Sequence, residues 1–465
     1  MDKKLYDLID SYAEDFAAHL TRWIQVPSVK DETGATVAPG APFGAEVRKM
    51  YDMALADCEA EGFVTRGFEG YALDATLPGE SEEAIAVLGH LDVVPAGDGW
   101  PMDPFAAVRE GDKIYGRGTS DDKGPSLCAL YAMKAIKEAG VPLKKSIRMI
   151  LGCDEESGWE DMGYYAEHVG LPEVGFSPDA SFPLINTEKA MLHMNFTAPV
   201  TKEGLQVKEM FTGERTNVIP GESKALLAGD RGPAGSEELA AAVAAYAEKT
   251  GLPYTAEVTA DGVWVTAEGI PGHSAYPEGR RNAIGMMLLL FKELGVQGAF
   301  ATLADAVGMT AHGENLGCAC EDAVSGPLTC NMGILHLENG EIFCTLDMRV
   351  PITADMDKLA ANAKAALPGF TVVHESQKAP HHVPAESELV SNLLAAYAEE
   401  TGLPAEPQST GGGTYAKCLK QGVAFGASFP DDEDLAHQAG EYVYLSKLIT
   451  ATKIYANALV RLAGK

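Results

Sequence analysis

Histidine and acidic residues recur in this sequence directly after short apolar runs, where a chain would leave a buried strand. Two such runs, Ala84–Gly89 and Ser146–Gly152, are each followed by residues of this kind. Ligand sites in α/β folds lie at the carboxyl ends of parallel strands, so we expect these side chains to meet at one edge of a sheet. The set comprises His90, Asp92, Asp121, Asp122, Asp154, Glu155, Glu156, Asp179 and the remote His437.

A divalent metal site is the chemistry that such a set favours. Carboxylates crowded together away from water are costly unless a positive charge compensates them, and a divalent cation does so best. Imidazole and carboxylate ligands suit zinc first, with manganese or cobalt as alternatives. One bridging carboxylate with two further ligands for each ion would hold two metals roughly 3.5–4 Å apart. Asp92, two residues after His90 on an extended chain, is expected to orient its imidazole.

Each feature also has a simpler explanation when taken alone. A histidine after an apolar strand is more often a hydrogen-bonded core or surface side chain than a ligand. Adjacent acids such as Glu155 and Glu156 are usually part of a solvated loop. Four clusters, each at the end of a candidate buried strand, are harder to explain in this way. The spacing alone leaves the reaction open.

Composition and charge restrict the partners. The 465 residues exceed the usual size of a single core, so two domains are expected, and 46% apolar with 22% charged residues is typical of globular proteins. A formal net charge of −31 argues against nucleic acid or an anionic membrane, because both attract clustered Lys and Arg. Most of the acidity is explained by a solvated surface.

The sequence also predicts a cytoplasmic location. Its first twenty residues lack the apolar core of a signal peptide, and no run approaches the roughly 18 apolar residues of a membrane span. The eight cysteines include no C-x-x-C pair, which favours reduced thiols over a disulfide framework.

The order of elements predicts an α/β fold. Strand 84–89, helix 126–138 and strand 146–152 follow one another, which implies a parallel sheet. Hairpin signals at Asp261-Gly262 and Asn339-Gly340 predict antiparallel sheet with packed helices in the middle third.

After Pro384 the α/β pattern resumes, with a strand expected over 423–429. We therefore predict an α/β domain with a mixed, mainly parallel sheet, formed by residues 1–185 and 384–465. An α+β domain with antiparallel sheet, residues 186–383, is predicted to be inserted into it.

Seven motifs occur in an order that spans most of the chain. They are Gly89-His-Leu-Asp-Val-Val-Pro95, Tyr115-Gly-Arg-Gly-Thr-Ser-Asp-Asp-Lys-Gly-Pro125, Asp154-Glu-Glu-Ser-Gly158, Phe176-Ser-Pro-Asp179, Gly272-His-Ser-Ala-Tyr-Pro277, Gly411-Gly-Gly-Thr-Tyr415 and Ala436-His-Gln438. Together they resemble the aminoacylase/carnosinase/ArgE–DapE family of di-metal peptidases and amidases. Gly97-Asp-Gly-Trp100 and the large inserted domain are most similar to its bacterial PepV-type dipeptidases. The resemblance implies a zinc-peptidase-like catalytic domain with an inserted lid.

The resemblance also implies the metal ligands and the general base. Asp121 would bridge both ions, with a cis peptide bond directly after it. His90 and Asp179 would complete one metal site, and Glu156 and His437 the other. Glu155 would take a proton from a water shared by the two ions and return it to the leaving amine.

For the substrate, the resemblance points to residues of the lid. His273 would donate to the oxyanion, and Arg349 would bind a free carboxylate through two parallel hydrogen bonds. Asn217 and the loop Gly411, Gly412 and Gly413 resemble further contacts. The free α-amine needs an acidic partner, for which Asp122 is the candidate.

The division of these residues between two domains predicts that lid closure assembles the site. The enlarged lid resembles proteins that supply the lid histidine within one chain, so a monomer is expected, with a homodimer as the alternative.

The predicted function is a metal-dependent dipeptidase acting on dipeptides or very short peptides with a free C-terminal carboxylate. One alternative is an N-acyl amino acid deacylase or carboxypeptidase with the same metals. Another is a non-catalytic metal-dependent peptide-binding protein, against which Glu155 argues because that residue is not needed to hold metal. A purely structural acidic protein is the last alternative.

Overall fold

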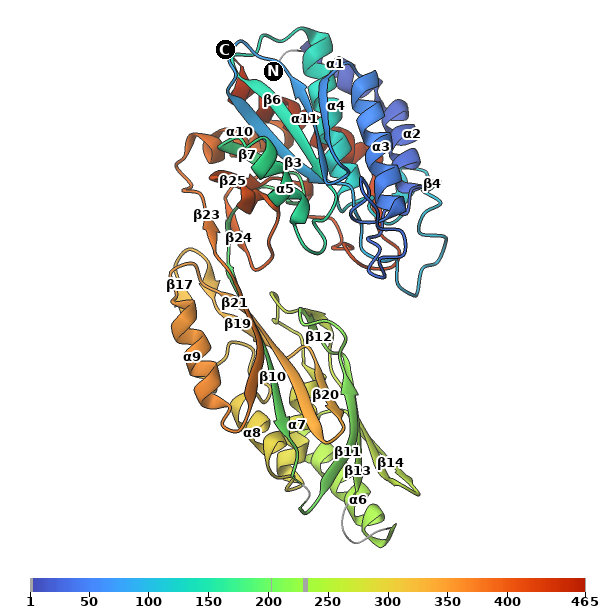
Figure 1. The fold of residues 1–465 in the computed structure, drawn as a ribbon, viewed down its shortest axis with the longest axis vertical. Coiled ribbons are helices and arrows are strands. Elements are labelled where there is room, and N and C mark those ends of the chain that lie inside the picture. Colours follow the sequence, from blue (N-terminus) through green and yellow to red (C-terminus); the bar gives the residue numbers. More distant parts are fainter. Residues whose placement is uncertain (1–2, 202, 229–232, 465) are drawn as a thin grey trace. The chain divides into compact units, whose positions relative to one another are not determined.

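The chain divides into two units, which a computed structural model describes over residues 3–201, 203–228 and 233–464 (Figure 1). The first unit contains Met1–Asn186, Val383–Gln408 and Gly413–Lys465, and the second contains Thr187–His382 and Ser409–Gly412.

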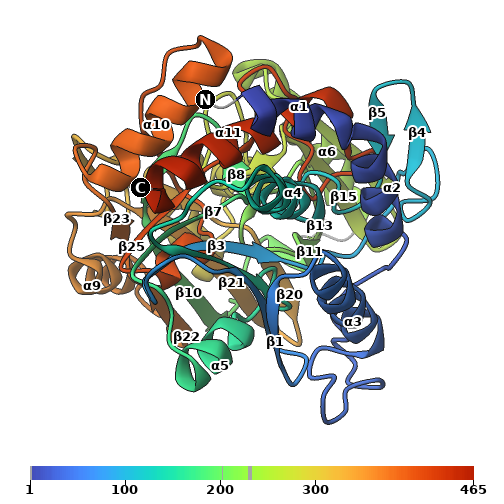
Figure 2. The ribbon, with the colours of Figure 1, turned by 90° about the horizontal axis from the view of Figure 1, so that it is seen from above.

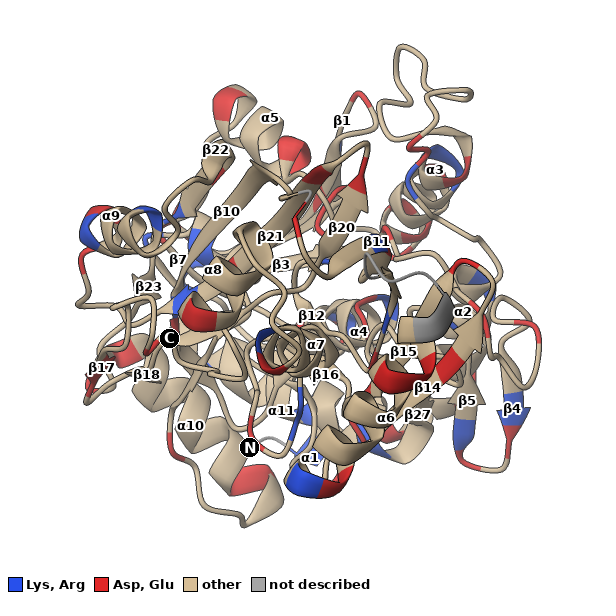
Figure 3. Ribbon diagram, turned by 90° about the horizontal axis from the view of Figure 1, so that it is seen from below, with Lys and Arg blue, Asp and Glu red and all other residues tan. Residues whose placement is uncertain are grey.

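No helix within the described ranges is both long and apolar enough to cross a membrane. Acidic residues occur on helices of both units, for example on α5 and α6 (Figure 3).

The first unit is built around a mixed sheet. Its helices are α1 (Lys3–Ser11), α2 (Ala13–Ile24), α3 (Ala45–Ala60), α4 (Lys123–Ala139), α5 (Glu160–His168), α10 (Glu388–Thr401), the short 3₁₀ helix η1 (Tyr415–Cys418) and α11 (Leu445–Ala463). Its strands are β1 (Val64–Phe68), β2 (Ala72–Leu77), β3 (Ala84–His90), β4 (Val108–Glu110), β5 (Lys113–Tyr115), β6 (Ser146–Gly152), β7 (Val174–Ser177), β8 (Ala180–Ser181), β25 (Gln421–Ala424), β26 (Ala427–Ser428) and β27 (Tyr442–Tyr444). The sheet order β1-β2-β6-β3-β7-β25 contains the parallel pairs β6–β3, β3–β7 and β7–β25, which confirms the predicted α/β class.

Both faces of the central strand β3 are covered, which explains its nearly continuous apolar sequence. Ile85 and Val87 point into a core shared with α4 and α11. Their neighbours Ala86 and Leu88 point to the opposite face, where they pack with Met162 of α5. Figure 2 shows α4 and α11 on one side of this strand and α5 on the other.

The second unit is built on an antiparallel sheet, as its hairpin signals predicted. The sheet order is β14-β15-β13-β11-β20-β21-β10-β22, and β14–β15 and β20–β21 form hairpins at the expected positions. The strands are β10 (Ala190–Pro199), β11 (Gln206–Thr212), β12 (Val218–Ile219), β13 (Glu222–Ala228), β14 (Tyr254–Thr259), β15 (Gly262–Glu268), β16 (Gly272–His273), β17 (Glu321–Asp322), β18 (Gly326–Pro327), β19 (Thr329–Asn331), β20 (Leu335–Glu338), β21 (Glu341–Val350) and β22 (Thr371–Lys378). Three strands at the unit boundary, β9 (Ile185–Glu188), β23 (His381–His382) and β24 (Gln408–Thr410), continue the sheet of the first unit beyond β25. The helices are α6 (Pro233–Thr250), α7 (Ala283–Glu293), α8 (Ala299–Ala306) and α9 (Met356–Ala366).

Two details differ from the prediction. The expected strand 423–429 is interrupted: β25 ends at Ala424, a cis peptide bond joins Gly426 to Ala427, and β26 pairs with β8 instead. Residues 409–412, expected with the segment 384–465, belong to the second unit. The Lys189 N–H donates to the Thr410 carbonyl at 2.9 Å and connects these residues to the second unit, although β24 itself pairs with β9 in the sheet that contains β25.

Candidate active site

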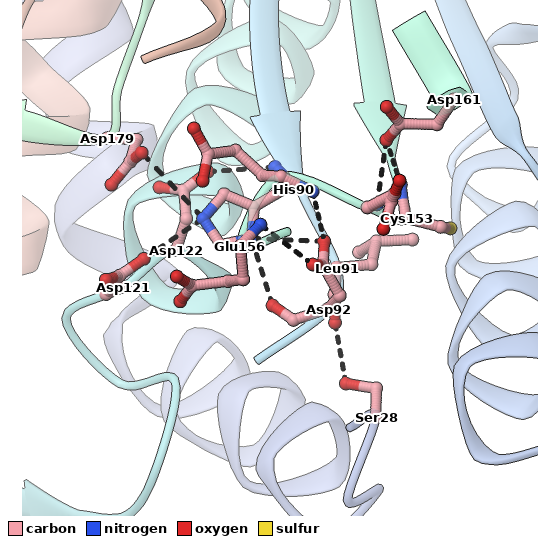
Figure 4. Close-up of polar contacts among 12 residues, drawn as sticks. Ser28, His90, Leu91, Asp92, Asp121, Asp122, Cys153, Glu156, Asp161 and Asp179 are labelled. Atoms are coloured by element: carbon pink, nitrogen blue, oxygen red, sulfur yellow. Dashed lines mark hydrogen bonds and ion pairs between the residues drawn. The ribbon is translucent and has the colours of Figure 1, made fainter. Parts of the chain in front are cut away.

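The predicted metal ligands of the first unit meet beside the carboxyl ends of its parallel strands, and Figure 4 shows four of them, His90, Asp121, Glu156 and Asp179. His90 is the last residue of β3, Glu156 follows β6 and Asp179 follows β7. Asp121 lies in the loop that leads into α4, and His437 lies between β26 and β27. The expectation of one shared edge is therefore met by residues from five separate segments.

Asp121 lies between the two histidines. Its Oδ1 is 3.0 Å from His90 Nε2, and its Oδ2 is 3.0 Å from His437 Nε2. His437 Nε2 is also 2.9 Å from a Glu156 carboxylate oxygen. One carboxylate that turns one oxygen to each imidazole is the arrangement that a bridging ligand requires. The peptide bond between Asp121 and Asp122 is cis, as the resemblance implied.

A second group of donors shares His90. The ligand atoms of His90, Glu155 and Asp179 lie within 4.8 Å of one another, as do those of His90, Asp121 and Glu156. His90 Nε2 is 3.8 Å from Asp179 Oδ2. The His90 ring is fully buried, and its Nδ1 lies 2.9 Å from the Asp92 carbonyl oxygen. A carbonyl only accepts, so Nδ1 carries the proton, and in the neutral ring Nε2 has its lone pair available for a cation.

Asp92 contacts the His90 ring mainly through its main chain. Its main-chain carbonyl holds the His90 ring, whereas its carboxylate lies 3.5 Å from Nδ1. The two carboxylate oxygens instead accept the backbone N–H groups of Glu155 and Glu156, each at 3.1 Å. Asp92 therefore fixes the start of the acidic segment after β6 as well as the ring at the end of β3.

The electrostatic potential of this cluster favours the binding of a cation. Burial raises the pKa of Glu155 and of Asp179 well above the usual range, and neighbouring carboxylates raise both further. Burial opposes protonation of His437, but contacts with Asp121 and Glu156 outweigh it and raise the His437 pKa to about 11. Acids that hold protons and histidines that attract them mark a negative potential that divalent cations would neutralise. The imidazole and carboxylate donors fit such ions.

Asp122 is not available to a substrate amine, which corrects the expectation for this residue. Its side chain is fully buried, and its Oδ2 accepts the His90 backbone N–H at 3.1 Å and the Ser126 hydroxyl at 2.8 Å. These contacts tie the start of α4 to the end of β3.

In the second unit, most of the predicted substrate residues belong to one hydrogen-bonded cluster. The Ser274 N–H donates to the Asn217 carbonyl at 2.9 Å, and the Ser274 hydroxyl donates to Asp347. Asp347 Oδ2 also accepts Arg349 Nε at 3.2 Å and Nη2 at 3.0 Å. Arg349 Nη1 donates to the Gly411 carbonyl at 2.7 Å. Gly412 lies in the same unit, whereas Gly413 belongs to the first unit.

Arg349 keeps part of its hydrogen-bonding capacity. A guanidinium carries five N–H donors, and three of them are engaged by Asp347 and Gly411. Within the described residues, no hydrogen-bond partner engages the second N–H of either terminal nitrogen, and these two N–H groups are the pair that matches a carboxylate. The predicted role of Arg349 is chemically compatible with this geometry.

The tautomer of His273 follows from a local contact. The Ala275 backbone N–H donates to His273 Nδ1 at 3.1 Å, so Nδ1 carries a lone pair. The proton of the neutral ring is then on Nε2, which makes that atom a hydrogen-bond donor. β16 places this exposed residue opposite Val218 of β12, next to Asn217.

The sequence profile of "Peptidase family M20/M25/M40" matches residues 86–461, a range that begins in β3 and ends in α11. The chain belongs to this family. The predicted family is thereby confirmed, and with it a hydrolytic enzyme with the divalent metal ions that M20 metallopeptidases use.

Relatives of this M20 chain match it over its full length. A Bacillus subtilis (strain 168) protein named "Putative dipeptidase YtjP" is 35% identical over 460 residues, 97% of each chain. The Beta-Ala-Xaa dipeptidase of Lactobacillus delbrueckii subsp. lactis is 30% identical over 471 residues, 99% of each chain. The fold is similar to human carnosine dipeptidase 1, with a TM-score of 0.59 and 14% identity over 99% of this chain and 98% of that one.

Two residues of the hydrogen-bonded cluster in the second unit, Asp347 and Ser274, were missed from the sequence. Asp347 precedes Arg349 by two positions on β21, so both side chains lie on the same face of the strand. Ser274 directly follows His273. The spacing of Asp347 and Arg349 could have predicted their contact, but nothing local indicated that Ser274 would bind the same carboxylate.

Proposed function

We propose that this protein is a metal-dependent dipeptidase that hydrolyses dipeptides or very short peptides with a free C-terminal carboxylate. The observation that carries the proposal is the Asp121 carboxylate, which lies 3.0 Å from each of two histidines. Full-length relatives named as dipeptidases favour a small peptide over other amides as the substrate.

The first unit supplies the ligands in this proposal. Asp121 would bridge two divalent ions, zinc first, with manganese or cobalt as alternatives. One ion would be completed by His90 and Asp179, and the other by Glu156 and His437. When bound, the ions would supply Lewis-acid chemistry that acidifies water and polarises the scissile carbonyl.

Glu155 is the general base in this proposal. It is grouped with His90 and Asp179, and its main chain is held by Asp92. Its carboxylate would take a proton from the attacking water as the water oxygen bonds to the carbonyl carbon. The same proton would pass to the leaving nitrogen as the C–N bond breaks, which releases a free amine.

The second unit supplies the substrate contacts in this proposal. His273 would donate its Nε2–H to the oxyanion, and Arg349 would bind the substrate carboxylate through its two remaining N–H groups. Asn217 and the Gly411–Gly413 loop are proposed as further contacts. We also propose that the protein works in the cytoplasm as a monomer.

Substrate profiling after metal reconstitution tests the function. We expect Ala-Ala and β-Ala-containing dipeptides to be cleaved in the presence of zinc, manganese or cobalt. Amidation of the C-terminus should lower kcat/KM by roughly 10–100-fold, because a charge-assisted pair with Arg349 is lost. Faster hydrolysis of N-acetylated amino acids than of free dipeptides would contradict the proposal and favour a deacylase.

A further inference from the structure

We propose that Glu441 is a positioning residue that fixes Asp121 relative to His437, an inference that rests on the proposed metal centre. Glu441 is fully buried and lies four residues after His437, just before β27. The proposed mechanism gives this buried acid no task. Its contacts nevertheless lead directly to the proposed bridging ligand.

The Glu441 carboxylate accepts hydrogen bonds from several N–H and O–H groups of the loop that contains Asp121. Oε1 accepts the Ser120 N–H at 2.8 Å and the Ser120 hydroxyl at 2.9 Å, and the Gly118 N–H lies 3.1 Å away. Oε2 forms an ion pair with Arg117 Nη1 at 2.7 Å. The Glu441 main-chain carbonyl accepts the Gly116 N–H at 2.9 Å. Residues 116–120 are therefore held by one side chain and its own backbone.

A carboxylate suits this position better than any neutral side chain. Every group that faces the Glu441 oxygens is a donor, and the Arg117 and Glu441 side chains are both almost completely buried. An acceptor-only group satisfies all of them, whereas a glutamine amide would turn its NH₂ towards other donors. Buried donors that lose their acceptor are unfavourable, so the loop would have to move.

Arg117 extends the same network to a third segment. Its Nη2 donates to the Ala96 carbonyl at 3.2 Å, and its guanidinium lies 5.2 Å from the centre of the Trp100 ring. The Trp100 indole donates to the same carbonyl at 2.7 Å. Trp100, the last residue of the motif Gly97-Asp-Gly-Trp100, therefore packs against the guanidinium that pairs with Glu441.

The consequence for the metal centre follows from chain connectivity. Asp121 directly follows Ser120, which Glu441 binds through two donors. His437 precedes Glu441 by four residues, and its left-handed backbone, with φ of 62°, turns the chain at this point. Movement of the loop against this segment would change the 3.0 Å separations between Asp121 and both histidines. Glu441 thus sets the spacing of ligands that it does not touch.

Metal-binding titration of Glu441→Gln tests this role without relying on turnover. The protein is freed of metal by chelation and titrated with zinc in competition with a chromogenic chelator. We expect the variant to bind zinc roughly 10–100-fold more weakly than the wild type, the usual effect of removing support behind a ligand. We also expect the visible absorption of the cobalt-loaded variant to differ from that of the wild type, because ligand geometry changes.

Asp74→Asn is the matched control. Asp74 is another fully buried carboxylate paired with an arginine, Arg66, at 2.5 Å, but its other side-chain partner is Tyr165 and not the metal centre. This control should keep wild-type zinc affinity while lowering the unfolding temperature. Wild-type affinity and cobalt spectrum in Glu441→Gln would overturn the proposal, as would an equal loss of affinity in the control.

Arg117→Lys keeps the test decisive if Glu441→Gln does not fold. This variant preserves the charge but loses the planar fork, and we expect a smaller loss of zinc affinity. Unchanged affinity would count against the network. If the wild type itself binds no metal, the proposed function fails and this inference fails with it. If the wild type binds zinc and both variants bind it equally well, the inference fails and the proposed function stands.

Discussion

At the scale of single residues, Glu155 and Glu156 are neighbours with different surroundings. Asp92 holds both backbone N–H groups, yet Glu156 contacts His437 and Glu155 is grouped with Asp179. Identical side chains one position apart thus reach different parts of the cluster. Their substitution should therefore produce different defects.

Glu155→Gln should abolish most turnover and leave metal binding intact. The amide cannot accept a proton, so we expect kcat to fall by roughly 10²–10⁴-fold. Metal content, measured by inductively coupled plasma mass spectrometry, should stay at the wild-type level. Glu156→Gln serves as the comparison and should lose metal. Near-normal kcat in metal-loaded Glu155→Gln would refute the assigned role.

Arg349→Lys should make the enzyme insensitive to the substrate carboxylate. Lysine keeps the charge but cannot form two parallel hydrogen bonds, so kcat/KM for a free dipeptide should drop by roughly 10-fold or more. The informative comparison is C-terminal amidation, which should harm the wild type much more than the variant. Equal losses in both proteins would show that Arg349 does not contact the carboxylate.

At the scale of elements, Asp347 links β21 to the loop after β16. Burial would raise its pKa, but His193, Arg349 and Ser274 outweigh that effect and hold the Asp347 pKa at about 2. The folded pKa lies below the usual 3.8, so the ionised form stabilises the fold above about pH 4. This contribution should be lost as the pH falls from about 4 towards 2.

Asp347→Asn should therefore destabilise the protein in a pH-dependent way. A carboxyl whose pKa is about 2 in the folded protein instead of 3.8 contributes roughly 2 kcal/mol to the free energy of unfolding at pH 7. Urea unfolding at pH 7, 4 and 3 measures the free energy of unfolding of the variant and of the wild type. The difference between the two free energies should become smaller as the pH falls. Asp261→Asn, in the exposed turn of the β14–β15 hairpin, removes the same charge and should change stability little at any pH. A pH-independent difference for Asp347→Asn would contradict this account.

Elements encoded by local patterns could be predicted from the sequence, and elements defined by distant partners could not. The hairpins at Asp261 and Asn339 follow from turn residues flanked by alternating apolar residues. The break between β25 and β26 lies at Gly426, whose effect depends on the pairing of Ala427 with Ala180 of β8, a distant partner. β24 pairs with β9, a strand more than 200 residues away in sequence, and no local pattern predicts that pairing.

The same distinction applies to the site. The proposed metal ligands follow strand ends and belong to recognisable motifs, so their proximity to one another could be predicted. The contacts of Glu441 could not, because its ionic partner Arg117 is 324 positions away. The partner of the Asp92 carboxylate was also missed, since two backbone N–H groups carry no signal in the sequence.

At the scale of the whole molecule, metal should act as a structural ligand of the fold. Removing it with a chelator leaves several carboxylates crowded in a buried cluster, so the unfolding temperature should fall. At 100 times the dissociation constant, metal adds roughly 2.7 kcal/mol, which corresponds to an increase of roughly 3–5 °C for a chain of this length. Calorimetry with and without zinc or manganese measures this shift. Because the cluster is buried, raising the sodium chloride concentration should not replace the metal; equal stabilisation by salt would contradict the assignment.

The second unit is not a single continuous insertion, because residues 409–412 also belong to it. The polypeptide passes between units at 186/187, 382/383, 408/409 and 412/413. A gene fragment encoding 187–382 alone would lack the Gly411 carbonyl that accepts from Arg349 and the Thr410 carbonyl that accepts from the Lys189 N–H. A chimaera that exchanges the second unit between two relatives would therefore need two replaced segments, residues 187–382 and residues 409–412.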